Sequence, residues 1–350
     1  MSLQIRPISA ADSAHWNQYV KTHPKATPYH NHAWIKSIEQ AYGHEDVSQV
    51  ATIDGKVVGI LPVIKMRIPL HGHFYCSLPY CDIGHILSNN EEITDALLEK
   101  LHHMKNESGA KKIEYRDVTP ISDMVISAEH MQGKKVSMLL SLPETSEQLS
   151  KSFKSKLRSQ IRKSEKNGLT YKIGNSVELI DTFYKVFIYN MRKLGSPVHS
   201  KQWFHAIRKN YADDALVSII YTDNTPIGAG IVLRNGDKAC IPWASTLSEY
   251  NRLAPNMLLY WSLLKEITDD GATEFDFGRS TYGEGTFKFK QQWGAKPRLL
   301  NWHLPGEQSG SLAISTESGK LRKMVEQTWS RLPISLTTFL GPAIRKYISL

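Results

Sequence analysis

The chain has 350 residues, which suits two domains of about 150 residues and is long enough to bury sizeable cores. Its 43 lysines and arginines exceed its 34 aspartates and glutamates, and a formal charge of +9 attracts polyanions without identifying one. The three cysteines do not form a disulfide framework, and no segment has the apolar length of a signal peptide or membrane span. We therefore expect a cytoplasmic protein without a metal site.

The chain contains an internal repeat with an offset of 169 residues. Both copies predict a helix that begins near a proline, a strand, an Asp-containing hairpin turn and a second strand. Each copy then continues with a strand, a helix and a strand, the order found in GNAT-type acyltransferase domains. The matching residues are Pro28, His30, Trp34, Ile38, Tyr42, Asp54 and Gly59 in the first copy, and Pro197, His199, Trp203, Ile207, Tyr211, Asp223 and Gly228 in the second.

The repeat predicts an α/β (α+β) fold with two tandem GNAT-like domains and mixed central sheets. We place the first domain at residues 1–145, the second at 146–304, and a Gly/Ser linker with a basic amphipathic segment at 305–350. In the first copy we expect a helix at 91–105 and strands at 47–53, 56–67, 74–78, 112–118 and 136–142. In the second we expect strands at 217–221, 226–234 and 239–246.

The junction between the copies is unusually basic. Residues 151–168 contain seven basic residues and one acid, with Phe153, Leu157 and Ile161 at helical spacing. Two interpretations stay open for the predicted helix at this position. In the first, its charged side is simply a solvated face. In the second, Arg158 and Arg162 bind phosphate groups, either of a substrate or of transfer RNA.

A helix is predicted at residues 255–269, since proline suits the first helical turn. In a GNAT enzyme a glycine-rich turn just before this helix holds the pyrophosphate of coenzyme A. Here the turn is Arg252-Leu253-Ala254-Pro255-Asn256-Met257, with no glycine and with one amide donor removed by proline. Coenzyme A is therefore disfavoured, and we expect no cofactor.

Polar residues follow a short apolar strand at Phe275-Asp276-Phe277. The strand should end near Gly278, which would put Arg279, Ser280 and Tyr282 at its carboxyl edge, where open sheets bind ligands. Residues 287–290 alternate aromatic and basic side chains, which predicts a strand or extended loop that directs one or both of Lys288 and Lys290 into a cleft. We take Lys290 as the lysine of the site and expect Lys288 to face away from it.

The motifs Phe275-Asp276-Phe277-Gly278-Arg279-Ser280 and Phe289-Lys290 through Trp293-Gly294 resemble the end of the second domain of FemAB-type proteins. The resemblance covers about residues 25–300 by eye and is strongest to the branch encoded beside exosortase and exopolysaccharide genes. It implies an acyl or aminoacyl transferase that acts on a cell-envelope or exopolysaccharide precursor. The activated donor would be a co-substrate such as aminoacyl-tRNA.

The resemblance also implies roles for individual residues. Lys290 would stabilise charge on the donor carbonyl, and Asp276 would orient an acceptor amine. Each assignment has a structural alternative. Asp276 and Arg279 could form a salt bridge that only stabilises the fold, and Lys290 could be an ordinary surface lysine. The expected substrate-binding residues are Arg279, Ser280, Tyr282, Trp243, Asn256, Tyr260, Arg192, Arg158 and Arg162.

The partners that we expect are an anionic small molecule or a lipid-linked glycan, with transfer RNA as a further candidate and DNA not expected. Residues 321–350 carry a basic, amphipathic pattern that packs against the first domain or touches a membrane surface. Two other functions stay open: a GNAT-fold N-acetyltransferase with an atypical coenzyme A loop, and a non-catalytic binding scaffold.

Overall fold

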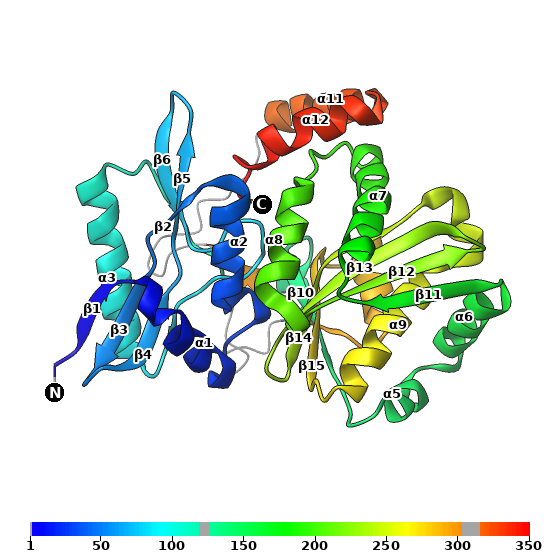
Figure 1. Cartoon of the computed structure of the whole chain (residues 1–350), viewed down its shortest axis with the longest axis horizontal. Coiled ribbons are helices and arrows are strands. Elements are labelled where there is room, and N and C mark those ends of the chain that lie inside the picture. The colour runs from blue at the N-terminus through cyan, green and yellow to red at the C-terminus, as the bar shows by residue number, and fades with distance from the viewer. Residues whose placement is uncertain (1, 119–126, 303–315) are drawn as a thin grey trace.

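The computed structural model describes residues 2–118, 127–302 and 316–350, and Figure 1 shows how their helices and strands are arranged. The described residues before the basic junction form four α-helices, two short 3-10 helices and ten strands. The helices are α1 (Ser13–Thr22), α2 (His32–Tyr42), α3 (Glu91–Ser108) and α4 (Ala128–Met131). The strands are β1 (Gln4–Pro7), β2 (Glu45–Asp46), β3 (Gln49–Ile53), β4 (Lys56–Leu61), β5 (Ile64–Ile68), β6 (Gly72–Cys76), β7 (Leu87–Ser88), β8 (Ile113–Glu114), β9 (Asp117–Val118) and β10 (Lys135–Ser141).

The second part has longer strands. Its helices are α5 (Ser146–Ser152), α6 (Ser155–Lys166), α7 (Val177–Lys193), α8 (Lys201–Tyr211), α9 (Pro255–Asp269) and α10 (Gly285–Gln291), followed by α11 (Thr316–Arg331) and α12 (Ile334–Arg345). Its strands are β11 (Leu169–Gly174), β12 (Ala215–Thr222), β13 (Thr225–Asn235), β14 (Lys238–Thr246), β15 (Glu274–Thr281) and β16 (Lys296–Asn301).

The repeat is preserved in the structure. The bounds of α2 and α8 differ by the predicted 169 residues at both ends. In each copy this helix is followed by an antiparallel hairpin whose turn holds an aspartate at positive φ, Asp54 at 49° and Asp223 at 51°. A non-glycine residue tolerates this left-handed conformation best when it is Asp or Asn. The predicted hairpin turns are therefore confirmed.

The two copies have different sheets. The first copy forms two four-stranded sheets, in the orders β1-β3-β4-β7 and β2-β5-β6-β8. The second forms an eight-stranded sheet in the order β11-β12-β13-β14-β15-β10-β16-β9. Strand β10 pairs with β15 and β16, so the prediction that it adds to the first copy's strands is wrong. The chain before residue 145 thus supplies strands to the larger sheet, while the domain limits stay a proposal.

Helices cover both faces of the larger sheet. Ile219 and Ile231 lie in the same apolar cluster as the inner side of α7, whereas Ile220 and Val232 lie in the cluster that contains α9. Adjacent residues of β12 and β13 thus point to opposite faces, as strand geometry requires. Both faces are apolar because both are covered.

Three predicted elements differ from the structure. The strand expected at 56–67 is broken at Pro62 into β4 and β5, which belong to different sheets, because proline has no N–H for a continuous ladder. The strand expected at 112–118 is present as the short pieces β8 and β9. The basic segment 151–168 is divided into α5 and α6, and its apolar stripe of Phe153, Leu157 and Ile161 is buried as predicted.

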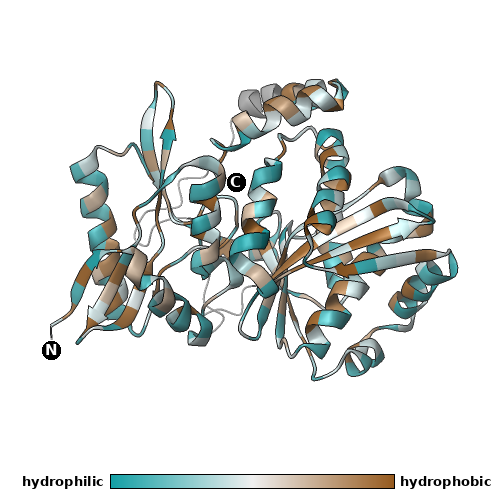
Figure 2. Ribbon diagram, in the orientation of Figure 1, coloured by the Kyte–Doolittle hydropathy of each residue, from teal (hydrophilic) through white to brown (hydrophobic). Residues whose placement is uncertain are grey.

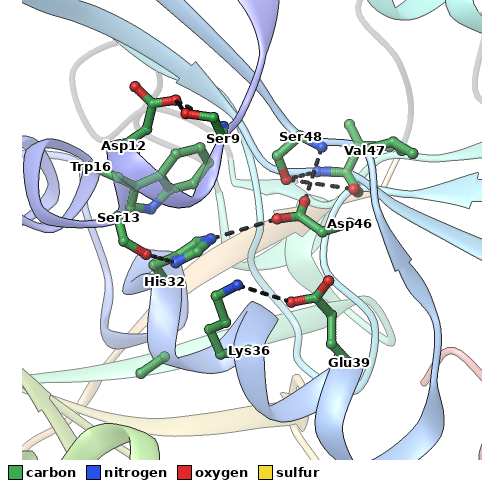
Figure 3. A network of polar contacts seen from close by, with 12 residues as sticks. Ser9, Asp12, Ser13, Trp16, His32, Lys36, Glu39, Asp46, Val47 and Ser48 are labelled. Carbon is green, nitrogen blue, oxygen red and sulfur yellow. Dashed lines mark hydrogen bonds and ion pairs between the residues drawn. The ribbon is translucent and has the colours of Figure 1, made fainter.

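A buried polar network ties the start of the first copy together (Figure 3). The His32 ring lies between α1 and β2, with Nδ1 2.5 Å from Ser13 Oγ and Nε2 3.5 Å from Asp46 Oδ2. Asp46 also accepts a bond from the Ser48 amide. These contacts link α1, the start of α2 and β2.

Candidate active site

Strands β14 and β15 separate in the middle of the larger sheet. They pair in parallel only from Lys238 opposite Glu274 to Cys240 opposite Asp276. Two residues further along β14, Pro242 has no amide hydrogen with which to continue the ladder. The strands diverge from that point, and a wedge opens between them at their carboxyl ends.

The wedge forms a cavity of about 510 Å³. Its walls come mainly from four parts of the chain. They are residues 241–245 and 277–279 of the separated strands, the end of α7 with the segment that follows it, the loop at residues 80–82 of the first copy, and the C-terminal residues Arg345, Ile348 and Leu350. Lys290 and Tyr260 also line it. The cavity therefore lies where the two copies and the C-terminal segment meet.

A β-bulge shapes the floor of the cavity. Ser137 pairs with Arg279 and Leu139 with Asp276, so β15 has one residue more than β10 over this interval. Gly278 occupies the bulge with φ of 74°, and its amide donates to Asp276 Oδ1 at 2.8 Å. The strand continues to Thr281, so the prediction that it ends near Gly278 is wrong. The change in backbone direction at Gly278 comes from this bulge and not from the end of the strand.

Lys290 reaches this bulge from α10. Residues 285–291 form a helix, not the predicted extended segment, because Phe287 and Lys290 share one buried helical face. Lys288 is exposed and faces away from the site as expected, because residues two apart point to opposite sides of a helix, whereas in an extended segment they would share a face. The Lys290 Nζ donates to the carbonyl oxygens of Gly278 at 2.9 Å and Arg279 at 2.8 Å.

Burial changes the proton affinity of this lysine. Its side chain is only 8% exposed, and no carboxylate lies within ion-pair distance among the described residues. Loss of hydration lowers the pKa of Lys290 to about 8, while the negative charges of Asp276 and Asp82 partly oppose that shift. An ammonium has three donors, and two are taken by the bulge carbonyls. No acceptor for the third is found among the described residues, and Lys290 lines the cavity.

Asp276 lies beneath the cavity floor. Its Oδ1 accepts from Ser137 Oγ at 2.5 Å and from the Gly278 amide, and the side chain does not line the cavity. Burial raises the pKa of Asp276, and the bond from Ser137 opposes the increase. These contacts give Asp276 a role in fixing the bulge that presents the carbonyls to Lys290.

Arg279 connects the two copies at the rim. Its Nη1 lies 3.2 Å from Asp82 Oδ1, and its guanidinium lies 5.4 Å from the ring centre of Trp302. The Trp302 indole N–H donates to the Asp82 carbonyl, which holds the three residues together. The arginine side chain is 35% exposed and lines the cavity.

Two aromatic residues predicted for the site also line the cavity. Trp243 stacks on Trp34 of the first copy, with ring centres 5.8 Å apart. Tyr260 stacks on Phe277 at 5.4 Å, and burial raises the pKa of its phenol to about 12. Tyr260 is therefore a neutral hydrogen-bonding group at neutral pH.

The remaining predicted residues lie outside the cavity lining. Ser280 is buried in β15, and Tyr282 packs on Phe287. Asn256 is in the first turn of α9, and Arg192 donates to the Leu332 carbonyl at 2.6 Å, next to the C-terminal helices. On α6, Arg158 donates to the Lys151 carbonyl and Arg162 is exposed.

The structure adds Arg345 to the cavity, a residue that sequence reasoning missed. Its Nε donates to His199 Nε2 at 3.2 Å, its Nη1 donates to the Ile348 carbonyl, and its guanidinium lies 5.4 Å from the ring centre of Tyr80. No carboxylate among the described residues forms an ion pair with it. The only sequence signal was the place of His199 in the repeat.

His199 holds Arg345 through its neutral ring. Burial, aided by the nearby guanidinium, lowers the pKa of His199 well below its usual range. Because Nε2 accepts from Arg345, the neutral ring carries its hydrogen on Nδ1, which lies 2.5 Å from Tyr42 Oη. The repeat thus places a histidine where it orients a cation.

Comparison with known proteins identifies the fold. Residues 151–291 match the family model for an acetyltransferase (GNAT) domain. A search of curated proteins gives no match. The solved structure of FemX is 14% identical over 93% of this chain and 100% of that chain, with a TM-score of 0.67.

Two other solved structures have the same arrangement. The C-terminal domain (DUF2156) of a putative lysylphosphatidylglycerol synthetase from Agrobacterium fabrum is 11% identical, with 89% of this chain and 96% of that chain covered and a TM-score of 0.53. A tandem GNAT protein from the clavulanic acid biosynthesis pathway is 12% identical, with 87% and 100% covered and a TM-score of 0.51. The predicted fold is thereby confirmed: the chain has two tandem GNAT-like domains, and its fold is similar to that of FemX, a protein of the FemAB family.

Proposed function

We propose that the chain transfers an acyl or aminoacyl group to an acceptor on a cell-envelope or exopolysaccharide precursor, and that Lys290 stabilises the transition state. The observation that carries the proposal is the buried ammonium of Lys290 at the β14–β15 wedge. Two of its donors are fixed by the bulge carbonyls, and the third remains for a carbonyl oxygen. A preorganised cation of this kind contributes most where negative charge develops during reaction.

The step that we propose is a direct displacement. A neutral acceptor amine attacks the donor carbonyl, a C–N bond forms, and negative charge collects on the carbonyl oxygen beside Lys290. The intermediate then collapses with cleavage of the donor C–O bond, and the proton lost by the amine goes to the departing oxygen. Lys290 remains an ammonium throughout, and the chain forms no covalent intermediate.

The charge of the cavity supports an anionic substrate. Arg279, Lys290 and Arg345 line it, and Asp82 is the one acidic side chain among the lining residues, which also include Leu350 at the end of the chain. Asp82 is paired with Arg279, which leaves the charges of Lys290 and Arg345 without an acidic partner in the described chain. A phosphate or carboxylate group of a nucleotide-linked or lipid-linked precursor would balance Arg345.

The turn before α9 favours a donor other than acetyl coenzyme A. Ala254 takes φ of 60°, and Pro255 begins the helix. The Ala254 amide donates to the Asn251 carbonyl and the Met257 amide to the Ala254 carbonyl, so these donors are used within the turn. A GNAT-fold N-acetyltransferase is the second candidate, because the family model matched by residues 151–291 is an acetyltransferase model.

A product assay tests the proposal. The full chain is incubated with aminoacyl-tRNA or acetyl coenzyme A, in combination with nucleotide-linked or undecaprenyl-linked amino sugars, and the products are examined by mass spectrometry. We expect an amide product that depends on Lys290 and persists in Lys288→Met. Turnover with acetyl coenzyme A alone would replace the proposal with the acetyltransferase. Failure to form product with any pair would favour a binding scaffold.

A further inference from the structure

The C-terminal helix α12 packs with its small residues inward. Thr337 and Gly341, one helical turn apart, are buried, and Arg345 continues this row to the cavity. A Cβ placed on Gly341 would lie 2.9 Å from Val198 Cγ1, so the glycine permits close contact with the segment that joins α7 to α8. The side of α12 that faces the protein is therefore its small and polar side.

Large apolar side chains point outward from the same helix. Phe339 is 80% exposed, and Leu336, Leu340 and Ile344 are exposed beside it at helical spacing. Met324 and Val325 are exposed on the neighbouring helix α11. Figure 1 shows α11 and α12 as outer elements beside the end of α7, and Figure 2 shows their hydrophobic segments. We call these six residues the α11–α12 apolar face. An exposed apolar group of this kind marks an interaction site.

Basic charge accompanies the apolar face. Residues 316–350 contain six lysines and arginines, of which Arg345 lines the candidate-site cavity, and two glutamates. Across the neighbouring cavity from Lys346 and Tyr347, the turn between β5 and β6 carries the fully exposed Leu70, with Lys65 and Arg67 on the strand below it. Apolar side chains combined with a basic surround are typical of segments that lie in the interface of an anionic bilayer.

The apolar face continues to the mouth of the candidate active site. Ile348 is exposed and lines the site cavity, and so does Leu194, which is 62% exposed. No helix in the described ranges is long and apolar enough to cross a membrane. These features fit contact with one leaflet.

We propose that the α11–α12 apolar face docks the protein on an anionic lipid surface, with Leu70 as a second contact. The bilayer receives Phe339 and its apolar neighbours, and Lys346 and Arg331 lie near the lipid phosphates. Docking in this way turns the rim formed by Leu194 and Ile348 toward the membrane. A lipid-linked substrate would then enter the cavity directly from the bilayer. This consequence rests on the proposed function, whereas the docking itself does not.

Vesicle flotation tests the docking directly with the full chain. The vesicles are pure phosphatidylcholine, or phosphatidylcholine mixed with phosphatidylglycerol. We expect binding to the anionic vesicles that weakens with salt and at least a 10-fold loss of affinity in Phe339→Ser/Leu340→Ser. Tyr171→Ser, at an exposed position on β11 far from α12 in sequence, is the matched control and should bind as the parent does.

Several outcomes would overturn the proposal. It fails if the parent does not bind anionic vesicles, or if Phe339→Ser/Leu340→Ser binds them as well as Tyr171→Ser does. A parent that forms a dimer dispersed by the double substitution, without vesicle binding, would assign the face to a second copy of the chain. Circular dichroism confirms folding of each variant. Lys290→Met should bind vesicles normally, which separates this test from that of the proposed function.

Discussion

The indole rings of Trp34 and Trp203 meet edge to face, with centres 5.2 Å apart and planes at 88°. The two residues occupy the same position in the two copies, so the repeat packs against itself through α2 and α8. Two tyrosines at another repeated position also cross the interface: Tyr42 Oη lies 2.5 Å from His199, and Tyr211 donates to the Pro28 carbonyl at 2.8 Å. The contact that joins the copies therefore also positions His199 and, through it, Arg345.

The two tryptophans should differ in how they tolerate phenylalanine. The Trp34 indole N–H donates to the Pro79 carbonyl at 3.0 Å, whereas the buried Trp203 indole nitrogen has no hydrogen-bond partner among the residues that the structure describes. We expect Trp34→Phe to cost about 1 kcal/mol more than Trp203→Phe, since only Trp34→Phe leaves a buried acceptor unpaired. Urea unfolding measures both changes. Equal costs, or a larger cost for Trp203→Phe, would contradict the hydrogen-bond assignment.

Sequence patterns predicted the elements that have strong local signals. Pro255 marked the start of α9, and the repeat located α2, α8 and the turns at Asp54 and Asp223. Helix α10 was missed because the alternation of Phe287, Lys288 and Phe289 covers too few residues to separate a helical period from a strand period.

Only part of the site was predicted, because local patterns identify some of its residues and not others. Lys290, Arg279, Trp243 and Tyr260 lie on elements next to the β14–β15 wedge. A motif resemblance pointed to Lys290 and Arg279, and the position of Trp243 and Tyr260 near a predicted strand end pointed to the other two. Arg345 reaches the cavity only because α12 folds back onto α7 and the first copy. No local pattern encodes such a long-range closure, so this part of the site required the structure.

Coenzyme A should bind weakly. The amides before α9 are used within their own turn, and Pro255 supplies none, so the pyrophosphate has no backbone cradle. We expect a dissociation constant no tighter than about 1 mM by calorimetry. A micromolar constant would favour the acetyltransferase candidate.

The basic face of α6 gives a separate prediction. If Arg158 and Arg162 contact phosphates, Arg158→Gln/Arg162→Gln should weaken binding of transfer RNA and lower the dependence of log affinity on log salt by up to about 2. Lys185→Gln/Lys209→Gln, which removes the same charge elsewhere, is the control. Salt slopes that are the same for both variants would mean that the α6 face is only solvated.

Removal of the Lys290 ammonium should slow turnover without unfolding the protein. We expect Lys290→Met to reduce kcat about 100-fold or more once a substrate pair is known, the effect typical of a lost oxyanion-stabilising group. Lys288→Met, two residues away on the exposed side of α10, is the matched control and should retain activity. The assignment is wrong if Lys288→Met is the more damaging change, or if Lys290→Met remains nearly fully active.

The lowered pKa of Lys290 predicts opposite effects of pH on rate and on stability. If the ammonium is the active form, kcat should be level below about pH 7 and fall as pH rises through about 8, where this group loses its proton. In the unfolded chain the same amine keeps its proton up to its ordinary pKa of 10.5. Between about pH 8 and 10.5 this amine is therefore more fully protonated in the unfolded state than in the folded state. As a result, the contribution of Lys290 to the free energy of unfolding increases with pH over this range.

We therefore expect the stability of the parent relative to Lys290→Met to rise from pH 7 to pH 10 while the parent's kcat falls. Denaturant unfolding of both proteins across this range, with the kcat profile measured in parallel, provides the check. A stability difference that does not change with pH would show that the pKa of Lys290 is not lowered in the folded protein.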